Sequence, residues 1–191
     1  MLKKYREQFP HIKIILKQMN NSEQISALNE NEIDIALVSV PIQHHNIQMA
    51  PIKKMNFVVA LPESHPLIHK PSLTFRDLEN ETFIITPKTA GSKYYETVMS
   101  AFKKENFTPN ISIQVHDLQT ALALVAAGMG IALTPSPMKA LNGVVHRKMD
   151  DFDLTIISSM AWRKDNKSEV LEKFLAFFFE YYLKELNEVN Y

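Results

Sequence analysis

The chain has 191 residues, enough for one large domain or two compact lobes. Its 21 basic and 21 acidic side chains cancel, which argues against a surface built throughout for nucleic acid or membrane phosphate. Cysteine is absent, which excludes disulfides, thiolate nucleophiles and cysteine-ligated metal clusters. No segment is typical of a membrane span or an export signal. We therefore expect a soluble, cytoplasmic protein.

Helices and strands alternate along the first forty residues. The spacing of apolar residues predicts a helix over 2–9, which Pro10 ends, and a strand over 12–19. A second helix is expected to begin at Asn21, whose side chain would form a capping box with Gln24. The nearly continuous apolar run over 33–40 predicts a strand covered on both faces. This alternation favours parallel strands with helices on both faces, an α/β fold.

The rest of the chain continues the alternation, with two exceptions. Apolar patterns predict helices over 93–105 and 118–127, a short turn ending near Leu141, a helix from Ser168 to about Leu186, and strands over 47–52, 56–61, 82–86, 111–115, 131–134, 144–148 and 154–162. The extended stretches 47–61 and 144–162 contain no helix, so the chain could cross there between two sheets. Two crossings would give two lobes with both termini in one of them; a single mixed sheet is the alternative.

Motifs for catalysis, metals or nucleotides are not indicated. Gly128-Met129-Gly130 ends a helix and opens a strand, whereas a dinucleotide fingerprint has the reverse order. A helix C-cap followed by a tight turn explains these glycines better. His65 and His69 are four residues apart, but the prolines around them disfavour a regular helix. We expect no metal ion, no cofactor and no catalytic residue.

Polar residues follow several predicted strands and open the helices after them. Asn20-Asn21-Ser22 follows the strand over 12–19, Ser39 lies near the end of the strand over 33–40, and Thr89-Ala90-Gly91-Ser92 follows the strand over 82–86. Ligands of open α/β sheets bind beyond the carboxyl ends of the strands, where helix amides and hydroxyls favour a carboxylate. Gly91 would let a ligand approach the backbone closely. Ordinary helix capping without a ligand is the alternative.

Four segments in this order and spacing resemble the effector-binding domain of LysR-type transcriptional regulators. They are FPHIKIILKQMNNSEQISALNENEIDIALV, VVALPESHPL, LVAAGMGIALTP and MAWRKD. The resemblance spans essentially the whole chain, and within the family it is similar to regulators of aromatic catabolism that sense compounds such as muconate or benzoate. It implies two Rossmann-like lobes of the type 2 periplasmic-binding-protein kind. Lobe I would comprise residues 1–54 and 159–191, and lobe II residues 55–158.

The same resemblance implies a function. A small organic, acidic effector would bind in the cleft between the lobes without being transformed. Full-length members would form homodimers or homotetramers, and would contact DNA only through an N-terminal winged helix-turn-helix that this sequence lacks. Family domains also open with a strand before the first helix, whereas this chain begins inside that helix. The first strand of lobe I would therefore be missing, and the chain would be a truncated fragment.

The effector contacts that the resemblance implies fall on polar positions of both lobes. They are Asn20, Asn21, Ser22 and Ser39 in lobe I, and Thr89, Gly91, Ser92, Tyr94 and Thr134 in lobe II, the last of them close to the hinge. Ser39 lies where some sensors of aromatic acids have an arginine. The absence of this positive charge disfavours a strongly charged dicarboxylate as the ligand.

Two further expectations concern partners and competing functions. The final helix carries more aromatic side chains than one stripe can bury, so a partner subunit could cover the surplus, and a wide core face is the alternative. In the family the first helix contacts the mate, which adds Leu2, Tyr5 and Phe9 as candidates. A solute-binding protein for transport and an enzyme would share this fold, but no acid–base group is nominated by spacing.

Overall fold

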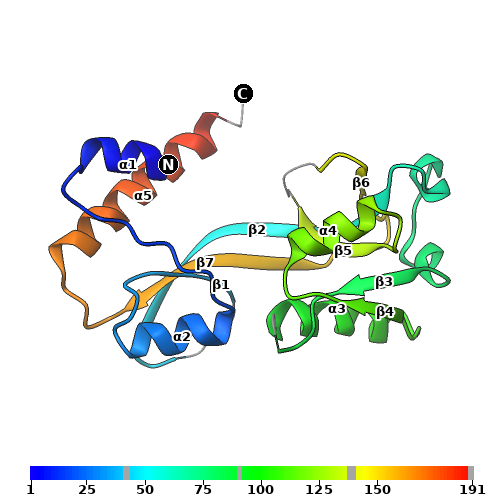
Figure 1. The fold of residues 1–191 in the computed structure, drawn as a ribbon, viewed down its shortest axis with the longest axis horizontal. Coiled ribbons are helices and arrows are strands. Elements are labelled where there is room, and N and C mark those ends of the chain that lie inside the picture. The colour runs from blue at the N-terminus through cyan, green and yellow to red at the C-terminus, as the bar shows by residue number, and fades with distance from the viewer. Residues whose placement is uncertain (41–43, 90–91, 137–140, 189–191) are drawn as a thin grey trace. The chain divides into compact units, whose positions relative to one another are not determined.

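The computed structural model describes residues 1–40, 44–89, 92–136 and 141–188 (Figure 1). Helices and strands alternate through most of the chain, as the sequence predicted. In chain order the elements are α1 (Leu2–Gln8), α2 (Asn21–Asn29), β1 (Ala36–Val40), β2 (Ile47–Pro62), the 3-10 helices η1 (Pro66–His69) and η2 (Phe75–Leu78), β3 (Thr82–Ile85), α3 (Ser92–Lys104), β4 (Asn110–Gln114), α4 (Leu118–Ala126), β5 (Ala132–Ser136), β6 (Val144–Arg147), β7 (Thr155–Arg163) and α5 (Glu169–Glu188). The short turn expected before Leu141 falls on residues 137–140, outside the described ones.

The chain divides into two compact units. Unit 1 comprises Met1–Ala36, Gln43–Gln48 and Ala161–Tyr191, and unit 2 comprises Leu37–Ile42 and Met49–Met160. The long strands β2 and β7 each contribute residues to both units. Both chain ends therefore belong to unit 1, while one long central segment forms most of unit 2.

Three parallel strands form the centre of unit 2. β3 pairs with β4 in parallel, and Phe83 of β3 forms a parallel bridge with Ile131, the residue before β5. Side chains alternate between the two faces of β3. Phe83 and Ile85 belong to the apolar core that contains the buried residues of α3, whereas Ile84 belongs to the core that contains those of α4. α3 and α4 consequently cover opposite faces of the parallel strands.

The larger sheet contains antiparallel pairs, so it is not the parallel sheet that the sequence favoured. Its hydrogen-bonded order is β1-β7-β2-β5, with β6 also paired to β2. β2 runs antiparallel to both β5 and β6. The sequence predicted two strands over 47–52 and 56–61, but β2 is one strand of 16 residues. The polar residues Lys53, Lys54 and Asn56 do not break it; they are exposed, and a continuous buried run begins at Phe57.

The expected strand over residues 12–19 is wrong. This segment forms no strand, and Ile15 and Leu16 are 67% and 77% exposed. Alternating apolar residues favour an extended backbone, but a strand also needs a neighbour to accept its hydrogen bonds. Among the described residues, the backbone amides of Lys13 to Lys17 have no acceptor. The apolar residues do alternate as in a strand, but the described structure offers this segment no neighbouring strand to pair with.

Aromatic packing between α1 and α5 holds unit 1 together. The Tyr5 ring is fully buried and lies 5.0 Å from the ring of Phe174 and 5.1 Å from that of Phe177, measured between centroids. Phe9 extends the contact, at 6.3 Å from Phe177. Both edge-to-face contacts of Tyr5 have a geometry that aromatic pairs prefer. Part of the aromatic surface of α5 is therefore covered within the same chain by α1.

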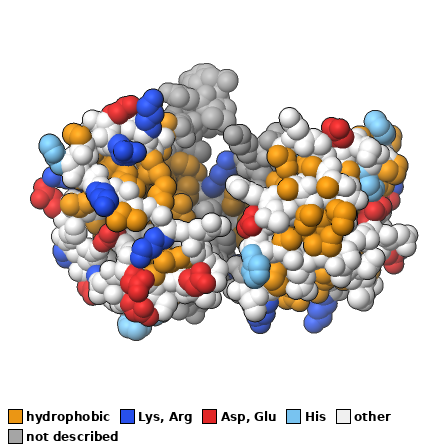
Figure 2. All heavy atoms as spheres, viewed as in Figure 1, with side chains coloured by type: hydrophobic (Ala, Val, Ile, Leu, Met, Phe, Trp, Pro, Cys, Tyr) orange, Lys and Arg blue, Asp and Glu red, His pale blue; other side chains and the backbone are white. Residues whose placement is uncertain are grey.

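The surface carries both signs of charge. Figure 2 shows basic and acidic side chains interspersed with apolar ones on the face in view, which agrees with the zero net charge. Within the described ranges, no group of three or more His, Asp and Glu side chains is arranged to hold a metal ion. No helix in the same ranges is long and apolar enough to cross a membrane.

Candidate ligand-binding site

The carboxyl ends of β3 and β5 form a switch point in unit 2. From β3 the chain continues through α3 to β4 on one side, and α4 then leads from β4 to β5 on the other side of β3 (Figure 1). The connection that leaves β3 runs to α3 on one face of the strands, and the connection that leaves β4 runs to α4 on the other face. A crevice at such a point is where open α/β sheets bind ligands.

Two buried hydroxyls lie at this switch point. Thr86 follows β3 directly and is 5% exposed, and Thr134 lies in β5 and is 0% exposed. Phe83 and Ile131 form a parallel bridge, and Thr86 and Thr134 each lie three residues beyond it along their own segments. Neither hydroxyl oxygen has a hydrogen-bond partner in the described structure. A buried hydroxyl without a hydrogen-bond partner lowers the stability of the fold by about 1–3 kcal/mol. A ligand that hydrogen-bonds to these two hydroxyls could offset the loss.

Tyr94 supports this strand end from the opposite face. Its hydroxyl donates a hydrogen bond to the backbone carbonyl of Leu133, with 2.7 Å between the two oxygens. Burial in the apolar core raises the pKa of the Tyr94 phenol well above its ordinary value. The proton is therefore retained at neutral pH and held by Leu133. Tyr94 fixes the position of β5 one residue before Thr134.

Replacement of Tyr94 by Phe should destabilise the protein by about 1–2 kcal/mol, because the Leu133 carbonyl loses its donor inside the core. Urea unfolding at pH 7 measures this. The matched control is Tyr95→Phe, because the neighbouring ring is half-buried and its hydroxyl has no partner in the described structure. Equal midpoints for the two variants would contradict the role given to Tyr94.

The first turn of α2 was predicted one residue too late. Asn20, not Asn21, is the N-cap: its side-chain oxygen accepts from the Glu23 amide at 3.0 Å. The Glu23 carboxylate accepts in return from the Asn20 amide at 2.8 Å, which completes the capping box. Asn21 and Ser22 are the first helical residues, and the Ser22 side chain is exposed. The structure shifts the box because Glu at the third helical position bonds the N-cap amide as well as Gln would.

The remaining predicted residues are spread over several elements. Ser39 lies in β1 and is half-buried, and Thr89 is exposed in the loop after β3. Ser92 is the first residue of α3, while Gly91 lies outside the described residues. The structure thus brings Thr134 and Tyr94 together through β5, and places Thr89 and Ser92 on the connection that leaves β3. Sequence reasoning missed Thr86, although a polar residue closing the apolar strand TFII could have indicated it.

The carboxylate of Asp117 lies at the start of α4. Asp117 is the N-cap of this helix, and its carboxylate accepts from the Thr120 amide at 2.9 Å and from the Thr120 hydroxyl at 2.8 Å. These hydrogen bonds, the backbone bond from Thr120 first, lower the pKa of Asp117. The carboxylate is charged at neutral pH and satisfies the positive end of this helix. Gly128 follows the helix with a φ of 74°, which confirms the predicted C-cap turn.

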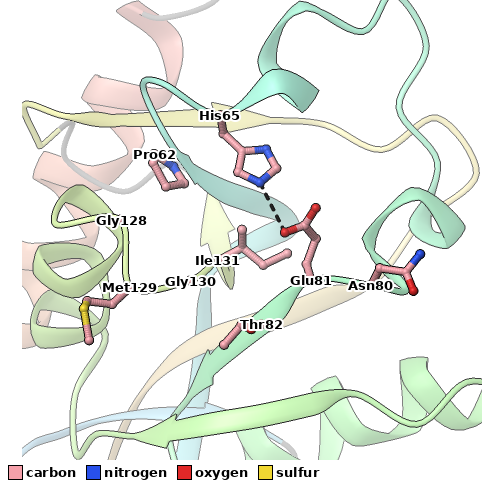
Figure 3. A pocket seen from close by; sticks show the side chains of 9 residues that line it. All are labelled: Pro62, His65, Asn80, Glu81, Thr82, Gly128, Met129, Gly130 and Ile131. Atoms are coloured by element: carbon pink, nitrogen blue, oxygen red, sulfur yellow. Dashed lines mark hydrogen bonds and ion pairs between the residues drawn. The ribbon is translucent and has the colours of Figure 1, made fainter.

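A hollow of about 230 Å³ in unit 2 lies at the amino ends of the parallel strands (Figure 3). Thr82, the first residue of β3, and Ile131 lie on one side of it, and His65 reaches over it to Glu81 with 3.2 Å between Nε2 and the carboxylate oxygen. The other ring nitrogen of His65 accepts from the Leu67 amide. Both ring nitrogens of His65 therefore hold η1 and the loop before β3 in place, so we assign His65 a structural role.

Comparison with known proteins decides the family. A family model described as LysR substrate binding domain matches residues 1–182. The chain belongs to the LysR substrate-binding domain family. This LysR domain is 33% identical over 177 residues to the HTH-type transcriptional regulator AlsR of Bacillus subtilis, a match that covers 92% of the chain and 59% of AlsR. The chain therefore spans about three fifths of the length of that relative.

Solved structures of LysR domains have the same fold. The effector-binding domain of a BenM variant superposes with a TM-score of 0.82 at 26% identity, covering 96% of this chain and 87% of that one. The BenM domain with its effector benzoate superposes with a TM-score of 0.73 at 26% identity, covering 92% and 84%. The LysR domain described here is thus a mixed α/β structure with the two-lobe, periplasmic-binding-protein-like fold of these domains, as the sequence predicted.

Proposed function

We propose that this chain is the ligand-sensing part of a LysR-type transcriptional regulator and binds a small organic acid. The observation that carries the proposal is the switch point at the carboxyl ends of β3 and β5, where two buried hydroxyls have no hydrogen-bond partner among the described residues. The BenM domain, which has the same fold, is described with benzoate as its effector. Asn20, Asn21, Ser22 and Ser39 would bind from lobe I, and Thr89, Gly91, Ser92, Tyr94 and Thr134 would act from lobe II.

The wider context of this function belongs to the same proposal. The full-length protein would bind DNA through a winged helix-turn-helix and act as a homodimer or homotetramer in the cytoplasm. The curated relatives support this, because they are named as transcriptional regulators. An enzyme is disfavoured, because the carboxylates that show a clear pKa shift are acids made stronger by helix caps or ion pairs, as in Asp77 and Asp117. A general acid or base would need a pKa moved toward neutrality.

Benzoate should raise the melting temperature of the purified chain in proportion to the logarithm of its concentration once the site is nearly saturated. At one hundred times the dissociation constant the stabilisation is about 2.7 kcal/mol. Differential scanning fluorimetry with benzoate, acetate and muconate measures it, with benzamide as the uncharged control for benzoate. Chromatography of the recovered acids should show them unchanged.

Variants of exposed serines locate the site. Ser22→Phe places a ring at the first turn of α2 and should abolish the stabilisation, whereas Ser112→Phe on β4 should leave it intact. The proposal fails if none of the three acids stabilises the chain, or if any of them is consumed. A response that both serine variants retain would leave the sensing function in place and remove α2 from the site.

A further inference from the structure

Thr86 and Thr134 form a pair whose chemistry differs from that of a helix start. Both side chains lie on the face of the parallel strands that α4 covers, as do Ile84 and Ala132 two residues before them. The antiparallel register of β2 and β5 places Val58 opposite Thr134 on the other side. The two hydroxyls are thus bordered by strands and covered by a helix, and none of the described residues offers either of them a hydrogen-bond partner.

The pair is suited to an uncharged oxygen rather than to a carboxylate. A hydroxyl both donates and accepts, so two of them can bind a ligand hydroxyl or carbonyl completely, but they bring no positive charge to a carboxylate. The start of α4 is occupied by the anionic Asp117, two residues after Val115, whose amide donates to the Ile85 carbonyl next to Thr86. A second anion beside it would be repelled and poorly solvated.

We propose that Thr86 and Thr134 together bind a hydroxyl or carbonyl oxygen of the ligand, so that the preferred ligand is a hydroxy- or keto-acid rather than a plain carboxylic acid. This rests on the proposed function and narrows its ligand class. Binding at this point explains why two hydroxyls are buried without partners: the pair destabilises the ligand-free protein and is satisfied when the ligand arrives. The carboxylate of the ligand then binds elsewhere in the site.

Matched acids that differ by one oxygen test the proposal on the wild-type chain. Isothermal titration with propionate, lactate and pyruvate, and with benzoate and its 2-hydroxy and 4-hydroxy derivatives, gives the dissociation constants. In at least one of the two series an oxygenated acid should bind about tenfold more tightly than its parent. This ratio corresponds to the net free energy of one or two hydrogen bonds. Equal affinities within both series would overturn the proposal while leaving the sensing function intact.

Valine variants test whether Thr86 and Thr134 cause the preference for oxygenated acids, because valine has the shape of threonine without its hydroxyl. Thr86→Val and Thr134→Val should each remove most of the preference for the oxygenated acid over its parent, and each should melt at the same or a higher temperature without ligand. Thr86→Ser should keep the preference. Thr108→Val, an exposed site before β4 at the amino end of the strands, should change neither quantity.

Three results would contradict the pair as a ligand-binding element. A preference that survives both valine variants would place the oxygen elsewhere. Lower melting temperatures of both valine variants without ligand would show that the hydroxyls serve stability, for instance through a buried water. Binding of no acid in either series would refute the proposed function, and this inference with it.

Discussion

Replacement of Gly130 by Ala is expected to destabilise the protein by about 3 kcal/mol or more. An added Cβ would lie 2.6 Å from the backbone oxygen of Thr82, and the φ of 152° is one that residues with side chains rarely adopt. The obstacle is backbone and cannot rotate aside. The same oxygen accepts from the Ile131 amide at 2.8 Å, so a shift of Thr82 would also break the link between β3 and β5.

Gly128 provides the matched control two residues away. Its φ of 74° also penalises a side chain, but no atom lies within 4 Å of an added Cβ. Gly128→Ala should therefore lose only about 1 kcal/mol, the backbone part of the effect. Urea unfolding of both variants separates the steric contribution from the conformational one. If the two variants unfold at the same urea concentration, close packing against Thr82 is not what requires a glycine at 130.

Local signals predicted most of the elements of unit 2. Asp117 before an apolar helical pattern and Gly128 after it mark both ends of α4, because capping depends on residues within one turn. β3 and β5 were predicted from short apolar runs, and each differs from its prediction only at its ends. Features that a few neighbouring residues determine can be read from the sequence, and the overall α/β class follows from their order.

Pairing is what the sequence does not encode locally. Residues 12–19 have the alternation of a strand, yet Ile15 and Leu16 are exposed and the segment is unpaired in the described structure. Conversely, β2 continues through the polar residues Lys53, Lys54 and Asn56 as one strand of 16 residues, within a sheet where it is bonded to β7, β5 and β6. A strand exists when two distant segments meet, so periodicity predicts the backbone conformation and leaves the partner open.

The candidate site shows the same division at the level of single side chains. Tyr94 was expected to contact a ligand, but its hydroxyl is donated to Leu133, 39 residues away. Thr86 was not singled out, although it is buried and its hydroxyl has no partner among the described residues. Whether a hydroxyl is satisfied depends on atoms that the sequence brings near only through folding. Residue type and position after a strand narrow the candidates, and tertiary contacts decide among them.

Truncation of Phe75 to Ala should destabilise unit 2 by about 3–5 kcal/mol. The ring is fully buried at the start of η2, with centroids 4.5 Å from Phe152, 5.2 Å from Phe107 and 5.4 Å from Phe102. Its amide also donates to the Asp151 carboxylate at 2.8 Å, so the residue joins the loop before β3 to the segment before β7. A four-residue 3-10 helix has little stability of its own, and the ring supplies the packing that holds it.

Phe107→Ala is the comparison within the same cluster, because that ring is only half-buried and should lose about 1–2 kcal/mol. Phe75→Leu keeps most of the apolar volume and should fall between the two alanine variants. Equilibrium unfolding in urea, monitored by far-UV circular dichroism, gives the three values. The order Phe75→Ala, Phe75→Leu, Phe107→Ala follows from burial and cavity size; a larger loss for Phe107→Ala would show that the outer ring, not Phe75, closes the aromatic cluster.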